Sequence, residues 1–191
     1  MKTFDPTSYG PVFAGLLSER RLQPLGPGSP NPSARPLLKQ LTVEAAFAHM
    51  AVKDRGQAAC CLAAIWLYHD CLDESHRISQ EIATPAGSWW HGILHRREPD
   101  YSNAKYWFRR AGWHPVFAPL GRAAAELARA STDPAVAFLA RQNDWDPFAF
   151  VDLCELCAAS ESPASLVCRQ VQQQEWELLF DFCYRAAGES A

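Results

Sequence analysis

Hydrophobic residues recur at helical spacing along most of the chain, and no segment shows the two-residue alternation that a half-buried β-strand requires. We therefore expect an all-α fold, built as a single-domain bundle of about seven to eight helices. Residues 41–191 form the predicted helical core, and residues 1–40 form an N-terminal arm with one short helix. The core helices are predicted over residues 42–53, 57–82, 88–97, 102–111, 119–130, 134–142, 147–159 and 163–187.

Proline and capping residues mark the boundaries of these segments. Seven of the fourteen prolines precede residue 40, and the stretch 22–36 cannot continue a helix because proline lacks the amide donor and restricts its predecessor. We therefore expect an ordered, proline-rich N-terminal arm. Asp133, Asp146 and Ser162 each stand before a proline, so each is expected to cap a helix that begins with that proline.

Composition narrows the class of protein. With 191 residues, 48% of them hydrophobic, the chain is long enough to bury the core of one domain. Its net charge of -3 argues against a general affinity for nucleic acid or anionic membranes. The chain lacks both the apolar core of a signal peptide and a membrane-length apolar stretch, so we expect a cytoplasmic protein without a membrane partner. The seven cysteines fall mostly in predicted helices, which indicates reduced, buried thiols.

The reactive side chains concentrate between Tyr68 and Pro115, a segment that holds five of the six histidines. If residues 57–82 form one continuous helix, its apolar face becomes polar towards its C-terminal end without changing direction. Such a helix would run from the core into the floor of a cleft. The stripe of polar side chains on this face would consist of His69, Asp73, His76 and Gln80.

The next predicted helix carries His91 and His95, which lie four residues apart and face the same side, with Glu98 alongside. A short turn at residues 84–87 would place this helix beside the preceding one. Imidazoles with a carboxylate and an open coordination position suit zinc, iron or manganese, which can activate water or polarise a substrate oxygen. The same groups without a metal could act as an acid and a base. The predicted catalytic residues, which are also the predicted metal ligands, are Asp73, His76, His91 and His95.

A small anionic molecule is the substrate that the surrounding charges favour. The segment 96–115 carries five basic and two acidic side chains, although the chain as a whole is acidic. Arginine side chains bind carboxylate and phosphate groups through paired hydrogen bonds. We therefore predict a His-, Asp- and Arg-rich cleft that binds a small anion, with or without a divalent metal ion. The predicted substrate-binding residues are His69, Gln80, Arg96, Lys105 and Arg109.

Other interpretations of the same segments remain open. The predicted hairpin over residues 88–111 resembles one tetratricopeptide repeat, so a non-catalytic module that binds a partner protein is the alternative function. The pair His69-Asp70 resembles the ligands of HD-type metal-dependent phosphohydrolases. In that resemblance, His49 and Asp144 are the candidates for the remaining ligands.

The segment from Arg96 to Arg110 interleaves basic and aromatic residues, which is typical of surfaces that hold a phosphate or stack a base. Nucleotide or RNA binding is therefore a third hypothesis, which the acidic remainder of the chain weakens. Cys154 and Cys157 have the spacing of redox and zinc sites, but they fall inside a predicted helix without a second pair. We interpret them as core residues. Homo-oligomers are compatible with the seven tryptophans but are not determined by them.

The phrases LDESHRISQ and GSWWHGILHRREPDYSNAKYWFRR, followed by Gly112 and His114-Pro115, resemble a family of small uncharacterised proteins. The resemblance covers roughly residues 68–117. It implies that this segment is the signature of the family. It implies no activity and assigns no catalytic roles.

Overall fold

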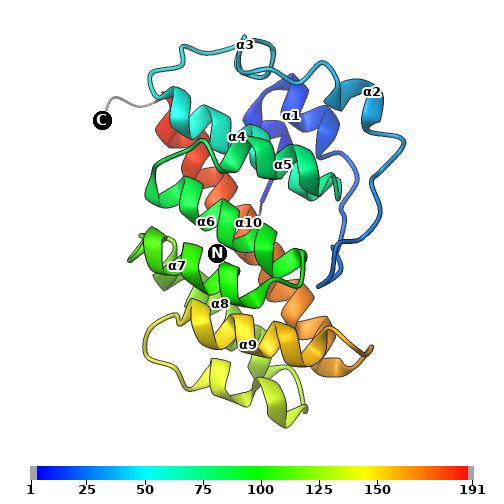
Figure 1. The fold of residues 1–191 in the computed structure, drawn as a ribbon, viewed down its shortest axis with the longest axis vertical. Helices are drawn as coiled ribbons and strands as arrows, with labels where there is room; N and C mark the ends of the chain where they lie inside the picture. The colour runs from blue at the N-terminus through cyan, green and yellow to red at the C-terminus, as the bar shows by residue number, and fades with distance from the viewer. Residues whose placement is uncertain (1–3, 189–191) are drawn as a thin grey trace.

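The computed structural model describes residues 4–188, which form α-helices, two short 3-10 helices and no strand. The predicted all-α class is confirmed, and these helices pack into one compact domain (Figure 1). None of the helices in this part of the chain is long and apolar enough to cross a membrane. The elements are η1 (Pro6–Tyr9), α1 (Pro11–Leu16), α2 (Arg35–Leu38), α3 (Val43–Ala46), α4 (Arg55–Tyr68), α5 (Leu72–Ser79), α6 (Pro85–Arg97), α7 (Tyr101–Ala111), α8 (Phe117–Arg129), η2 (Pro134–Ala140), α9 (Pro147–Cys157) and α10 (Pro163–Gly188).

Side-chain caps start several helices where the sequence predicts them. Asp146 accepts backbone N–H bonds of 2.8 and 3.1 Å at the start of α9, as predicted. Thr84 accepts one of 3.1 Å at the start of α6, which begins at Pro85 and not at the predicted residue 88. Asp133 caps the element that follows it, but this element is the 3-10 helix η2. Between residues 42 and 53 only the short α3 forms, so the helix predicted there is wrong over most of its length.

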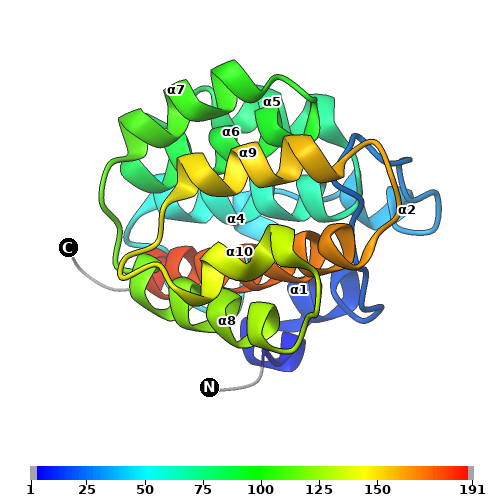
Figure 2. The same ribbon diagram turned by 90° about the horizontal axis from the view of Figure 1, so that it is seen from below.

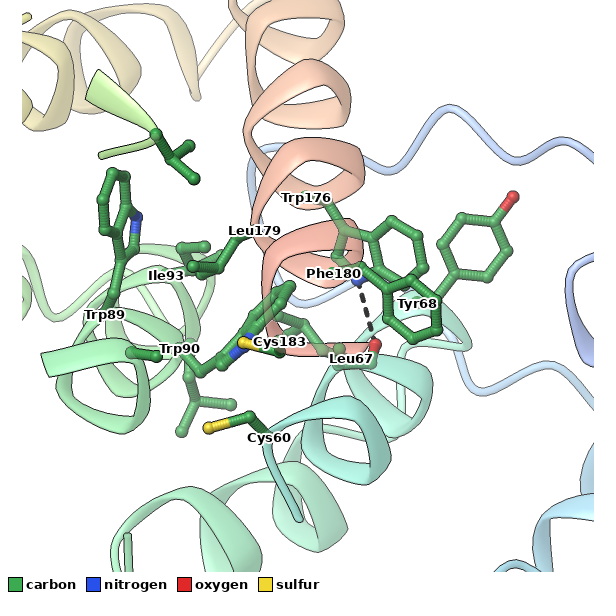
Figure 3. Close-up of a cluster of buried hydrophobic side chains, with 14 of the residues drawn as sticks. Cys60, Leu67, Tyr68, Trp89, Trp90, Ile93, Trp176, Leu179, Phe180 and Cys183 are labelled. Atoms are coloured by element: carbon green, nitrogen blue, oxygen red, sulfur yellow. Dashed lines mark hydrogen bonds between the residues drawn. The ribbon is translucent and has the colours of Figure 1, made fainter. Parts of the chain in front are cut away.

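The longest of these helices, α10, runs through the centre of the bundle. It contacts α4, α8, α9 and η2, and Figure 2 shows it between α8 and α4. On α10, the rings of Trp176 and Phe180 stack with 4.9 Å between their centroids. The indole N–H of Trp176 donates a 3.0 Å hydrogen bond to the carbonyl of Ala64 on α4 (Figure 3). Large aromatic side chains whose polar atoms find backbone partners therefore fill the centre of the fold.

The helix predicted over residues 57–82 is interrupted, and the structure has two helices, α4 and α5, in its place. His69 forms the C-cap of α4, and Asp70 follows in the left-handed conformation with a φ of 59°. The Asp70 carboxylate accepts hydrogen bonds from Arg97 (2.6 Å) and Arg21 (3.0 Å). The predicted continuous stripe that would join His69 to the polar residues of α5 is therefore wrong, because the chain changes direction between them.

Side chains of the helical core bind the backbone of the proline-rich N-terminal segment. Arg97 donates to the carbonyls of residues 26 and 27 at 2.7 and 3.1 Å. From α10, Arg169 and Gln172 donate to three carbonyls of residues 22–24, at distances between 2.9 and 3.1 Å. The arm contains η1, α1 and α2, where the sequence predicts one short helix.

The two helices α6 and α7 lie side by side as the predicted hairpin, joined by the short turn at residues 98–100. Gly92 permits their close approach. A Cβ atom at this position would lie 3.0 Å from the ring of Phe108, which is tighter than an ordinary van der Waals contact. The likeness of the hairpin to a tetratricopeptide repeat stays a prediction.

His114 is a buried histidine of the core, only 3% exposed, between the rings of Trp89 and Phe182. The backbone N–H of Val116 donates a 3.3 Å hydrogen bond to its Nδ1 atom, so the ring is neutral. Burial lowers the pKa of His114 to about 4.

We expect Asp70→Asn to lower the free energy of unfolding by about 3–5 kcal/mol, because Arg97 would then keep a buried charge without a counter-charge. Asparagine tolerates the left-handed backbone conformation, so the substitution isolates the loss of charge. Urea denaturation measures the effect. Asp73→Asn, at an exposed carboxylate on α5, is the matched control and should stay within about 0.5 kcal/mol of the wild type. Equal stabilities of the two variants would contradict the role given to Asp70.

The free energy of unfolding should also fall as the pH drops from about 6.5 to about 4. In this range His114 takes up a proton in the unfolded chain but not in the native protein, so acid favours unfolding. One such group contributes a slope of about 1.4 kcal/mol per pH unit. We expect His114→Asn, which retains an acceptor for Val116, to reduce the slope by nearly that amount between pH 6 and 5 and by about half of it between pH 7 and 6, as measured by urea denaturation. An unchanged slope in the variant would show that His114 is protonated in the native state.

Candidate metal centre

Three histidines from two helices converge in the structure. His76 lies on α5, and His91 and His95 lie on successive turns of α6, which packs against α5. One nitrogen atom from each ring lies within 4.8 Å of the other two. The centroids of the rings are 4.7 to 5.1 Å apart. These three residues, which we call the histidine cluster, form the one group of metal-ligating side chains found among residues 4–188.

The turn between α5 and α6 brings the histidine cluster together. The chain reverses over residues 80–84, and Pro85 then starts α6 with its fixed backbone angle. Gly87 faces the backbone carbonyl of Ile82 so closely that a Cβ atom at this position would overlap with it. A side chain at residue 87 would therefore push the two helices apart, so the small residue is needed for the reversal.

His91 is the most enclosed member of the histidine cluster. It is 2% exposed, and neither of its ring nitrogens has a hydrogen-bond partner among the described residues. Its ring stacks between those of His95 and Trp107, with 4.7 and 4.0 Å between centroids. Burial, followed by the nearby His95 and His76 side chains, lowers the pKa of His91 to about 4. A neutral imidazole that keeps its lone pair at neutral pH is the form that binds a metal ion.

Glu98 supplies a carboxylate beside the histidine cluster. One of its oxygens lies 3.1 Å from Nδ1 of His95, and the other lies 3.7 Å from Nδ1 of His76. The side-chain amide of Asn103 on α7 lies 3.1 Å from Nε2 of His95. The cluster is therefore lined by polar groups on two sides, and by the indole of Trp107 on a third.

The other predicted members of this site lie apart from the histidine cluster. Asp73 and Gln80 are exposed, and Asp73 does not belong to the group of converging ligand atoms. His69 is buried at the end of α4, where its Nε2 donates a 2.9 Å hydrogen bond to the carbonyl of Leu16. The amide of Asn31 bonds its other nitrogen at 3.2 Å, so His69 fastens the N-terminal arm.

The three predicted basic ligands of the substrate are engaged elsewhere. Arg96 is fully buried and forms an ion pair with Glu175 of α10. Burial acts to lower the pKa of the Arg96 guanidinium, but the adjacent Glu175 carboxylate, together with smaller contributions of nearby cysteines, raises that pKa above its usual value. Lys105 forms an ion pair with an aspartate of α9. The Arg109 guanidinium lies 5.9 Å from the ring centre of a phenylalanine that is also on α9.

The ligand set suggested by the resemblance to HD-type phosphohydrolases does not assemble. His49 bonds the hydroxyl of Tyr184 at 2.6 Å, and Asp70 is paired with arginines. His69, Asp70, His49 and Asp144 form no group of converging ligand atoms within residues 4–188. All seven cysteines are free and buried, as expected for reduced core thiols.

Sequence patterns predicted part of this site. The four-residue spacing of His91 and His95 placed both on one face, and Glu98 continues that face. Asn103 and Trp107 were not predicted as site residues, although they too are four residues apart and share one face of α7. Their spacing indicates that they share one face of α7. The spacing does not show that this face packs against His91 and His95, because that depends on how the helices pack.

Comparisons of the chain with family models, with curated proteins and with solved structures found no match. Membership of residues 68–117 in a family of small proteins therefore stays a prediction.

Proposed function

We propose that this protein binds a divalent transition metal ion through His76, His91 and His95, and that the ion binds a small anionic ligand. His91 supports the proposal most directly. A buried polar side chain normally has hydrogen-bond partners, and more than about 90% of such groups do. His91 has none at either ring nitrogen among residues 4–188, and two further imidazoles face it. A metal ion shared by the three rings would provide the missing partner.

The donor set suits zinc, iron(II) or manganese(II). Neutral imidazoles are common ligands of these ions, and three of them leave a coordination position open. In a tetrahedral zinc site with bonds of about 2.1 Å, the ligand nitrogens lie about 3.4 Å apart. The nitrogens of the histidine cluster lie within 4.8 Å of one another. Binding would therefore require the nitrogens that lie furthest apart to approach each other by about 1.4 Å, with a reorientation of the rings.

Glu98 would orient two of the ligands. A carboxylate that accepts the Nδ1–H of a histidine fixes its tautomer, makes the ring a stronger base and leaves Nε2 as the ligand atom. At His95 the side-chain amide of Asn103, 3.1 Å from Nε2, would have to move aside for the ion. The distances from Glu98 to Nδ1 of His95 and His76, 3.1 and 3.7 Å, suit this role. Glu98 thus replaces Asp73 as the carboxylate of the proposed site.

The open position would face solvent on the side of His76 and Glu98, whose side chains are 36% and 27% exposed. His91 and His95 close the opposite side. A carboxylate, a phosphate or a water molecule could reach the ion from the open side, and the ion would polarise the bound oxygen. This side therefore fits the small anionic ligand that the sequence predicts.

The proposal requires that protein purified without chelators contain about one zinc, iron or manganese ion per chain by elemental analysis. His91→Ala should lose this metal. His49→Ala removes an exposed histidine outside the cluster and should retain it. Cobalt(II)-substituted protein should change its visible spectrum on addition of inorganic phosphate or acetate. If the wild type binds none of these ions after dialysis against them, or if His91→Ala binds them equally well, the proposal is wrong.

Glu98→Gln should weaken metal binding by about 10- to 100-fold, the usual effect of removing a carboxylate that orients a histidine ligand. Asp73→Asn should change the affinity less than about twofold, because its side chain is exposed and outside the cluster. Competition with a fluorescent zinc chelator measures both affinities. The opposite order of the two effects would favour the ligand set predicted from the sequence.

A further inference from the structure

Asn103 places a side-chain amide beside the histidine cluster from α7. Its amide nitrogen lies 3.1 Å from Nε2 and 3.5 Å from Nδ1 of His95. The helix α7 packs side by side with α6, which carries His91 and His95 (Figure 1). One turn after Asn103, the ring of Trp107 stacks on that of His91. Asn103 is therefore the polar member of the α7 face that covers the two histidines of α6.

The amide nitrogen of Asn103 competes with a metal ion for a lone pair of His95. Because Glu98 lies at Nδ1 of His95, Nε2 carries the lone pair that accepts the N–H of Asn103. A metal ion at Nε2 takes this lone pair, so the N–H loses its acceptor and faces a cation instead. A half-turn about the last side-chain bond exchanges the nitrogen for the amide oxygen, which has lone pairs and no hydrogen. The movement that admits the ion thus presents an oxygen donor to it.

The charges around Asn103 favour a cation. The carboxylates of Glu98 and Asp100 both lie near His95. Among residues 4–188, neither carboxylate forms an ion pair with a lysine or arginine. Two uncompensated negative charges favour the binding of a divalent ion. Asp100 also accepts the backbone N–H of Asn103 at 3.2 Å, and it keeps this bond when the side-chain amide turns.

An oxygen ligand from Asn103 changes which ion the histidine cluster suits. Three imidazole nitrogens and one amide oxygen fill a tetrahedral zinc site and leave no position for a small anion. Iron(II) and manganese(II) accept about six ligands, so four ligands from the protein leave about two positions open. Imidazole suits iron, and carbonyl oxygen suits manganese. A donor set that includes Asn103 and still binds an anion therefore favours these two ions over zinc.

We infer that Asn103 is the fourth ligand of the ion proposed at the histidine cluster, and that this ion is iron(II) or manganese(II). The ion binds a chelating anion, such as a 2-hydroxy carboxylate, whose two oxygens fill both open positions. A simple carboxylate that binds through one oxygen fills only one of them. The role of Asn103 depends on the proposed metal site, because without a bound ion its amide only donates to His95.

Metal affinities of the full chain and of two Asn103 variants test this role. Asn103→Leu should weaken manganese(II) binding about 10- to 100-fold and zinc(II) binding less than about threefold, because zinc keeps three imidazoles and takes up water. Asn103→Asp should bind manganese(II) at least as tightly as the wild type, since a carboxylate oxygen can replace the amide oxygen. Aspartate cannot donate a hydrogen bond to His95, so a purely structural amide would make both variants equally weak.

Ser102→Asp is the control for the added charge of Asn103→Asp. It places a carboxylate on the neighbouring exposed residue of α7 and should raise the affinity for manganese(II) about twofold or less. The electron paramagnetic resonance signal of free manganese(II) measures its binding, and competition with a fluorescent chelator measures that of zinc(II). Circular dichroism and thermal unfolding should show that each variant keeps its fold.

Glycolate and acetate, which differ by one hydroxyl group, test the class of ligand. Glycolate should bind the manganese-loaded protein at least about tenfold more tightly than acetate in isothermal titration calorimetry, because its hydroxyl and carboxylate oxygens reach the same ion. Equal affinities for the two anions would overturn the assignment of a chelating ligand.

The possible failures of the two proposals can be told apart. Manganese(II) binding that His91→Ala abolishes and Asn103→Leu leaves unchanged would overturn the role of Asn103 and leave the histidine site standing. Equal weakening in Asn103→Leu and Asn103→Asp would overturn it as well. A wild-type chain that binds none of the three ions would overturn both proposals.

Discussion

The buried ion pair between Asp70 and Arg97 is the interaction on which the rest of the structure depends. It joins the end of α4, the end of α6 and, through the other bonds of Arg97, the N-terminal arm. Because Asp70 turns the chain between α4 and α5, it sets the direction of the helix that carries His76. Arg97 ends the helix that carries His91 and His95. The geometry of the histidine cluster therefore follows from a charge pair that contacts none of its rings.

Two adjacent arginines form ion pairs on opposite sides of α6. Arg97 reaches Asp70, whereas Arg96 reaches Glu175 on α10, which also accepts a 2.8 Å bond from the indole of Trp89. Each buried guanidinium has one carboxylate, and removal of either carboxylate would leave a charge in a medium that solvates it poorly. Buried charge pairs of this kind select one helix arrangement among many that would bury similar apolar area. They explain why Arg96 and Arg97, two of the five basic residues of the segment 96–115, lie in the interior rather than on an anion-binding surface.

Local signals in the sequence are sufficient to predict the fold class and the ends of most helices. Caps before prolines and the four-residue spacing of His91 and His95 depend on neighbours in the chain, so they can be predicted from it. The break at Asp70 could not be predicted, because no glycine or proline marks it and its cause is a contact with Arg97, 27 residues further on. Asp73 lies on the same helix as His76, so the break does not change their relative direction, but its side chain is exposed and outside the group of converging ligand atoms. Glu98 follows His95 by three residues at the end of α6, and this spacing brings its carboxylate beside the histidines.

The hydrogen bonds that attach the N-terminal arm to the core determine which residues of this protein can be substituted. The carbonyls of residues 22–24, 26 and 27 accept hydrogen bonds from Arg97, Arg169 and Gln172. Every amino acid supplies a backbone carbonyl, so most of these hydrogen bonds do not depend on the side chains of the arm. The donors on α6 and α10 are side chains, so their substitution would remove the hydrogen bonds. Related chains should therefore preserve the two arginines and the glutamine. The other residues of the arm can vary, as long as its prolines and glycines maintain the same backbone conformation.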